Sequence, residues 1–172
     1  MQGEALLKSG LETIGDKIVD ALQKEFEAQG HNNTGNALQS IVYAVQQLSD
    51  GFQLNITFSK YLLYVDGGVK PAKVPFQIGS GARTSKYIKA LTAWVIQRNI
   101  VSSQKQAKQI AFAIARTHKK EGIPGLGGFA FSGNGRRTGF LSKNKILGQV
   151  PAMVEEMIAD WALRTAEEIL FL

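Results

Sequence analysis

The apolar residues of the first 58 positions follow two different periods, and each period dictates a different kind of element. From residue 4 to 29 they recur at steps of three and four, which predicts one long amphipathic helix that stops at Gly30. The recurring residues are Leu7, Leu11, Ile14, Ile18, Leu22 and Phe26. From residue 52 to 58 they alternate with polar residues, and the preceding Asp50-Gly51 is a favoured hairpin turn. Strands over about 39–47 and 52–58 with one buried face are therefore expected after the helix.

The remaining apolar spacing predicts three more helices. Two cover 85–99 and 103 to about 120, and Pro151 begins the last, which extends to about residue 170 because proline is tolerated in a first helical turn. The inward face of this last helix is expected to carry Val154, Met157, Ile158, Trp161 and Ile169. The predicted fold class is α+β, with a long N-terminal helix and a C-terminal helix packed on a small antiparallel sheet. Residues 1–172 form a single domain in this prediction, with 84–120 as a helical insertion.

Residues 121–148 are rich in glycine and have no clear period. A structureless loop of this length is uncommon in a compact domain, and such loops are usually functional or disordered. Phe129, Phe131, Phe140 and Leu141 offer apolar anchors in this stretch. We therefore expect a basic, glycine-rich arm or loop that reaches a neighbouring subunit.

The charge of +6 is unevenly distributed. Residues 1–59 hold three basic and seven acidic side chains, residues 60–145 hold sixteen basic and two acidic, and residues 146–172 hold one basic and five acidic. A basic middle of this kind favours a polyanion, an acidic protein surface or the chain's own acidic ends. The apolar runs are too short for a membrane span, so no membrane partner is expected.

The sequence offers little for catalysis. It has no cysteine, and His31 and His118 lie outside any metal-binding spacing. The glycines at 133, 135 and 139 do not match the spacing of a phosphate-binding loop. We therefore expect no cofactor, no metal and no enzymatic activity, and an enzyme is the weakest of the functional hypotheses.

The strongest physical signal is the basic middle. Its side chains suit sequence-independent phosphate contacts or contacts between subunits, and a merely solvated helix face is an equal alternative. The residues concerned are Lys105, Lys108, Arg116, Lys119, Lys120, Arg136 and Arg137.

Two short segments resemble a family of tailed-bacteriophage tail-completion and head–tail connector (neck) proteins. Residues 34–41 are similar to its Thr-Gly-x-Leu-x-x-Ser-Ile element, with one residue inserted between the glycine and the leucine, and residues 61–68 to its Tyr-x-x-Tyr-Val-Glu-x-Gly element. The matching positions are Thr34, Gly35, Leu38, Ser40 and Ile41, then Tyr61, Tyr64, Val65, Asp66 and Gly68. These residue types suggest fold-forming roles, in which Gly35 turns the chain into the first strand and the two tyrosines pack on the sheet.

The resemblance implies a structural virion protein that is assembled in the host cytoplasm as a ring in the neck. Its implied partners are further copies of itself and neighbouring connector, portal or tail proteins, with non-specific contact to genomic DNA in the channel. The alternative from the residues alone is a sequence-independent nucleic-acid-binding protein.

Overall fold

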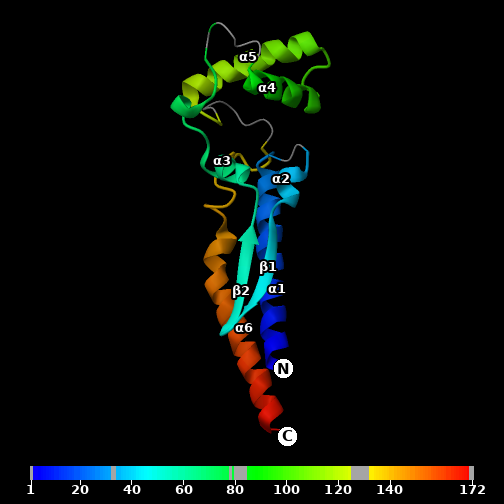
Figure 1. The fold of residues 1–172 in the computed structure, drawn as a ribbon, viewed down its shortest axis with the longest axis vertical. Coiled ribbons are helices and arrows are strands. Elements are labelled where there is room, and N and C mark those ends of the chain that lie inside the picture. The colour runs from blue at the N-terminus through cyan, green and yellow to red at the C-terminus, as the bar shows by residue number, and fades with distance from the viewer. Residues whose placement is uncertain (1, 32–33, 78, 80–84, 125–131, 171–172) are drawn as a thin grey trace.

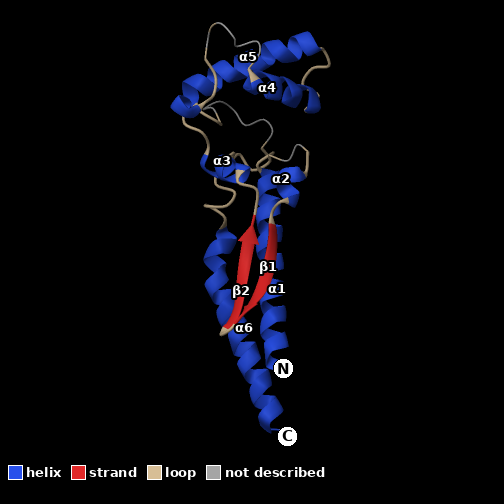
Figure 2. Cartoon of the chain, viewed as in Figure 1, coloured by secondary structure: helices blue, strands red, loops and turns tan. Residues whose placement is uncertain are grey.

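The computed structural model describes residues 2–31, 34–77, 79, 85–124 and 132–170. Its fold is α+β, as the sequence predicts, with helices and a two-stranded antiparallel sheet (Figures 1 and 2). The elements in chain order are α1 (Gln2–Ala28), α2 (Asn36–Gln39), β1 (Val42–Leu48), β2 (Gly51–Thr57), α3 (Tyr61–Gly67), the 3-10 helix η1 (Pro71–Lys73), α4 (Lys86–Gln97), α5 (Gln104–Glu121) and α6 (Lys145–Leu170).

The two longest helices lie side by side and run in opposite directions, so that the start of α1 and the end of α6 lie toward the same end of an elongated molecule (Figure 1). With 27 residues, α1 is about 40 Å long. Glycines on α1 permit close approach, because a Cβ on Gly3 would lie 3.1 Å from Trp161 Nε1 of α6. On the side facing the hairpin, a Cβ on Gly15 would lie 2.6 Å from the ring of Tyr43. We call α1, α6 and the β1–β2 hairpin the stalk.

The hairpin covers the stalk helices with one face. Tyr43 pairs with Ile56 and Val45 with Leu54, and these side chains are half-buried. Their neighbours along the strands are mostly exposed, which confirms the alternation predicted from the sequence. The core between hairpin and helices is built around Ile14, Ile18, Leu22, Phe26, Ile41, Leu62 and Phe140.

A second hydrophobic core lies at the other end of the molecule, where α4 and α5 form a helical pair (Figure 1). Ala107, Ala111 and Ala115 recur every four residues on α5 and are fully buried, since small side chains on one helix face allow close contact. Val74 and Phe76 pack against the same core. We call α4, α5 and η1 the head.

Several local expectations are wrong. α6 begins at Lys145, so Pro151 lies inside the helix rather than at its start, and Ile158 is 47% exposed rather than inward. Ile169 lies outside the residues whose side chains are described. Residues 61–67 form a helix in which Tyr61 and Tyr64 face solvent and do not pack on the sheet. No described helix is both long and apolar enough to cross a membrane.

Candidate functional site at the junction of stalk and head

The junction is built around the end of α1, where the chain closes the helix with a Schellman motif. The Gly30 N–H donates to Glu27 O and the His31 N–H to Phe26 O. Gly30 has a φ of 71°, the left-handed conformation that this cap requires and that glycine adopts without strain. The imidazole of His31 then packs against the ring of Phe26 in a tilted arrangement, with the ring centroids 5.2 Å apart, which adds an aromatic contact to the cap.

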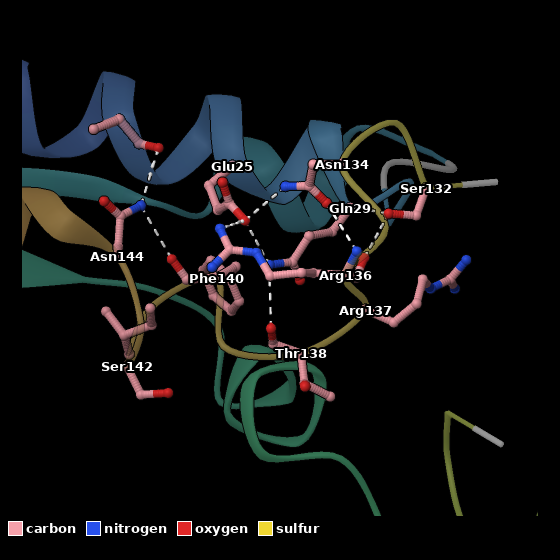
Figure 3. A network of polar contacts seen from close by, with 12 residues as sticks. Glu25, Gln29, Ser132, Asn134, Arg136, Arg137, Thr138, Phe140, Ser142 and Asn144 are labelled. Carbon is pink, nitrogen blue, oxygen red and sulfur yellow. Dashed lines mark hydrogen bonds and ion pairs between the residues drawn. The ribbon is translucent and has the colours of Figure 1, made fainter. Parts of the chain in front are cut away.

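The described part of the expected arm, residues 132–144, folds back onto the end of α1 of its own chain. Phe140 is fully buried in the stalk core and meets Phe26 edge to face at 5.4 Å. The Arg136 guanidinium forms an ion pair with Glu25, whose Oε1 also accepts a hydrogen bond from Asn134 Nδ2 at 2.9 Å (Figure 3). The expectation of an arm that extends to a neighbour is therefore wrong for these residues, because their apolar anchor and their charge both find partners in α1. Phe129 and Phe131 lie outside the described residues.

A second anchor for this returning segment is Asp66, from the Tyr-Val-Asp motif. Its Oδ1 accepts hydrogen bonds from the N–H groups of Leu141 and Ser142 at 2.8 and 3.0 Å. Its backbone carbonyl accepts a third from the Gly139 N–H at 2.9 Å. The carboxylate thus satisfies backbone donors of a loop 75 residues away in the chain, which is a structural role.

The Thr-Gly motif begins α2 rather than leading directly into the first strand. Gly35 has a φ of 81° at the N-cap of α2, so the expected need for glycine is confirmed while the expected strand start is three residues too early. Ile41 is fully buried and Leu38 packs beside it. The Ser40 Oγ donates to Ala37 O at 2.7 Å and accepts from the Ser59 N–H at 3.1 Å, which ties the two ends of the hairpin together.

From α3, Val65 packs against the stalk core, whereas three large side chains face solvent. Tyr61 is 60% exposed, Leu63 51% and Tyr64 59%. We call these three residues the α3 patch. Gly68 ends α3 at a φ of 70°. A Cβ at this position would lie 2.6 Å from Ile123 O, so the absence of a side chain allows the β-bridge between Val69 and Ile123 to form.

Both motifs reach one cavity of about 440 Å³ between α2, α3 and α4. We call it the junction cavity. Its lining includes Thr34, Gly35, Tyr61, Trp94, Arg98 and Arg137. These residues come from four separate stretches of the chain, so the tertiary fold, and not any local motif, assembles the cavity.

A chain of hydrogen bonds holds His31 beside the cavity. Its Nε2 lies 3.0 Å from Arg137 O and 3.2 Å from Gln29 Oε1, and the Gln29 amide donates to Glu25 Oε1 and Thr138 O. Two acceptors around Nε2 require the proton on this nitrogen. Burial, followed by the positive charge of Arg137, lowers the pKa of His31 to about 4, so the ring is neutral at pH 7.

Arg137 itself lies half-buried in the cavity wall. Burial, and next the positive charge of Arg98, lowers the pKa of its guanidinium. Its Nε is buried without a hydrogen-bond partner among the described residues. Arg136 and Arg137 were predicted as one basic pair, yet the structure separates them, because Arg136 is paired with Glu25 and Arg137 faces the cavity.

The remaining predicted basic residues lie on α5 of the head. Lys105, Lys108, Arg116 and Lys120 are exposed, in agreement with their expected place on the wet side. Lys119 is half-buried and donates to Val74 O at 3.3 Å, so it contributes to the fold of the head. The predicted basic residues therefore do not form one site.

His118 has a structural partner at the same helix end. Its Nδ1 lies 2.6 Å from the hydroxyl of Tyr87 on α4. Burial raises the pKa of Tyr87 to about 12 and lowers that of His118, so the phenol donates to a neutral imidazole.

Sequence reasoning missed Arg98, Trp94 and Gln29 as junction residues. Arg98 Nη2 donates to Gly30 O at 2.7 Å, and its guanidinium carbon lies 6.0 Å from the Trp94 ring centroid. An arginine and a tryptophan four residues apart on one helix were the available signal, since such residues are neighbours on the helix surface.

Within the described ranges, no three His, Asp or Glu side chains are arranged to hold a metal ion. Comparison of the chain with protein-family models, with curated proteins and with solved structures gave no match. The resemblance to the connector family therefore rests on the two sequence motifs alone.

Proposed function

We propose that this protein is a structural subunit of a tailed-bacteriophage virion and forms a ring in the head–tail connector or tail-completion region. The observation that carries this proposal is the α3 patch, in which two tyrosines and a leucine are each more than half exposed. Large aromatic side chains are enriched in protein interfaces and dominate their binding energy. The fold-forming roles of Gly35, Ile41 and Asp66 agree with a scaffold that presents surfaces to neighbours.

The occupant of the α3 patch is a second copy of this chain, through the outer side of α6. An exposed apolar stripe follows α6 at helical spacing and consists of Leu147, Pro151, Ile158 and Ala162. Glu155 is also exposed and lies on the same side of the helix, whereas Lys60 is exposed directly before Tyr61. The two surfaces are thus complementary in apolar character and in charge.

A contact between two different surfaces of identical subunits is heterologous, and such contacts form a ring when the rotation from one subunit to the next closes. The charges of the whole chain suit the same arrangement. α4 and α5 together carry seven basic and one acidic side chain, whereas α1 and α6 carry five basic and eleven acidic side chains. Long-range attraction between the head of one subunit and the stalk of the next would orient the encounter.

Two variants that each lack one surface test this proposal. Leu63→Ala/Tyr64→Ala removes most of the α3 patch but keeps Tyr61 in the junction cavity, and Ile158→Glu places a charge in the α6 stripe. In analytical ultracentrifugation at high protein concentration we expect each variant to stay monomeric, while an equimolar mixture forms heterodimers through the one remaining pair of intact surfaces. Electron microscopy of the wild-type assembly should show a ring.

The outcomes separate the interface from the function. If both variants still form the ring, the proposed structural role stands, but the subunits contact each other through other surfaces. A wild-type protein that never associates, even with virion partners, would contradict the ring. As a charge test, Lys60→Glu should weaken assembly and Glu155→Lys in the same chain should restore it.

A second candidate function, sequence-independent binding of nucleic acid, is favoured by the four exposed cations on α5. Lys105 and Lys120 are separated by about 22 Å along the helix axis, a distance over which duplex DNA presents several phosphates. Replacement of the four side chains by glutamine should flatten the salt dependence of binding to a random duplex. The matched control neutralises Lys8, Lys17 and Lys24 on α1. Equal slopes in both variants, or no binding by the wild type, would contradict this function.

A further inference from the structure

We propose that Asn134 is a modification site, at which spontaneous deamidation turns the side-chain amide into a carboxylate and loosens the hold of residues 132–144 on α1. This inference goes beyond the ring assembly and does not depend on it. Asn134 and Gly135 form the only Asn-Gly pair of the sequence. In such a pair the backbone nitrogen of the glycine can approach the side-chain carbon of the asparagine with little hindrance, because glycine has no Cβ.

The pair lies in a turn that is open to solvent. Asn134 and Gly135 are both exposed. Gly135 has a φ of 72°, and a Cβ built on it would have no neighbour within 4 Å. Water can therefore reach the reacting atoms, and a small leaving group can diffuse away.

The side-chain oxygen of Asn134 is held by hydrogen-bond donors. The Arg136 N–H donates to Asn134 Oδ1 at 3.1 Å, and the Ser132 hydroxyl lies 3.1 Å from the same oxygen (Figure 3). The hydroxyl also lies 2.6 Å from Arg136 O and shares its proton between the two oxygens, so the backbone N–H is the constant donor. Attack on Cγ moves negative charge onto Oδ1, and donors fixed around that oxygen stabilise the charge. The hydrogen bond from two residues further on also folds the side chain back over its own backbone, toward the Gly135 nitrogen.

The reaction needs only water as a co-reactant. The Gly135 nitrogen attacks Asn134 Cγ, so that a new N–C bond forms and the Cγ–Nδ2 bond breaks. The proton that the attacking nitrogen loses leaves with the amide group as ammonia. Water then opens the imide ring: cleavage of the new bond gives aspartate, and cleavage of the original peptide bond gives isoaspartate, in which the main chain runs through Cγ. Both products carry a carboxylate where the amide was.

The amide that is lost links the returning segment to α1. Asn134 Nδ2 donates to Glu25 Oε1 at 2.9 Å, and Arg136 forms an ion pair with the same carboxylate. After deamidation an oxygen faces Glu25 in place of a donor, so a hydrogen bond is lost and two carboxylates compete for one guanidinium. Isoaspartate also lengthens the main chain next to Gly133, whose N–H donates to Ala28 O at 2.7 Å.

The change should stay local, because the other end of the segment is anchored separately. Phe140 is fully buried in the stalk core. Asp66 accepts hydrogen bonds from the N–H groups of Leu141 and Ser142. Deamidation should therefore loosen residues 132–136 while the fold persists.

Peptide mass spectrometry of the full chain, kept folded in neutral buffer over days, tests the site. We expect the peptide that contains Asn134 to gain the mass difference between an amide and an acid. The internal control is Asn144, whose Oδ1 accepts from the Ile146 N–H at 3.1 Å in the same local arrangement, but which is half-buried and followed by Lys145. Gly135→Ser should slow the change by about tenfold or more, because a side chain at this position hinders the attack. No change at Asn134, or equal change at Asn134 and Asn144, would overturn the proposal.

Limited digestion with trypsin tests the consequence, since trypsin cleaves after Arg136 and Arg137 once this stretch detaches. Asn134→Asp reproduces the charge of the product, and the matched control Asn134→Ser removes the same donor without adding charge. We expect Asn134→Asp to be cleaved there at least about threefold faster than Asn134→Ser, because cleavage follows the population of the open form. Equal cleavage would overturn the loosening.

A second pair of measurements keeps this part testable if a variant does not fold. Aged wild-type protein, separated by anion exchange from the unmodified form, should be cleaved faster than that form, and equal cleavage of the two would overturn the loosening. In a Glu25→Gln chain the difference between Asn134→Asp and Asn134→Ser should disappear, because the opposing carboxylate is gone. A difference that persists there would show that Glu25 is not what the new charge opposes and would overturn this part of the proposal.

Discussion

Phe140 meets Phe26 edge to face, with ring centroids 5.4 Å apart, so the glycine-rich segment completes the core that α1 begins. The two residues are separated by more than 110 positions in the sequence. The sequence predicts a free arm for this stretch, but through this contact the stretch packs against the stalk. Arg137, three residues before Phe140, lies in the wall of the junction cavity.

Phe140→Ala should therefore destabilise the whole protein. Removal of a fully buried phenyl ring leaves a cavity and costs about 3–5 kcal/mol of unfolding free energy. Urea unfolding followed by circular dichroism measures the loss. Ser142→Ala, in the same segment but with an exposed side chain, serves as the control and should change the stability by less than about 0.5 kcal/mol.

Asp66→Ala should cost about 1–3 kcal/mol, because the N–H groups of Leu141 and Ser142 both lose their acceptor. Asp66→Asn keeps an oxygen at Oδ1 and should lose less than Asp66→Ala. Asp160 is a carboxylate control, since its ion pair with Arg164 is more than half exposed and such pairs contribute little. If Asp66→Ala behaves like Asp160→Ala in thermal unfolding, the anchoring role is wrong.

Gly15→Ala and Gly148→Ala should have opposite effects on stability, although both lie inside helices. At Gly15 a Cβ would lie 2.6 Å from Tyr43 and push the hairpin off α1, at a cost of about 1–3 kcal/mol. At Gly148 nothing lies within 4 Å, so the variant should gain up to about 1 kcal/mol from helix propensity. Chemical denaturation of both variants side by side checks the sign, and a stabilised Gly15→Ala would contradict the close approach.

Because the folded protein disfavours protonation of His31, the protein should become less stable as the pH falls into the mildly acidic range. Its pKa is about 4 in the folded chain against 6.5 for the unperturbed group, so the unfolded state binds more protons between these values. The contribution of the neutral ring is complete above pH 6.5 and falls as the pH decreases to about 4.

The comparison that isolates this effect is His31→Gln, measured by urea unfolding from pH 7 to 4. His118 also has a lowered pKa and acts in the same direction, but it is present in both proteins and cancels. The difference in stability between wild type and variant should shrink as the pH falls. A constant difference would show that His31 does not titrate as its burial requires.

Much of the fold could be read from local patterns. The period of three and four residues gave α1, the period of two gave the hairpin, and Gly30 marked the helix end. Local patterns failed where two interpretations compete. Pro151 suits a first helical turn, yet the helix begins six residues earlier, at Lys145, because Ile146 and Val150 already pack against the core. Tyr61 and Tyr64 were expected to pack on the sheet, but Leu62 and Val65 are the residues of that helix that pack against the core.

By itself, the sequence determined the α+β class, the two amphipathic helices that frame the stalk, and the concentration of positive charge in the middle of the chain. Each of these follows from spacing or composition over short distances along the chain. Only the tertiary structure decided that Arg136 pairs with Glu25 while Arg137 lines the junction cavity, and that Thr34 and Tyr61 share this cavity. These relationships join residues tens of positions apart, and no periodicity encodes them, because they arise when separate elements pack against a common core.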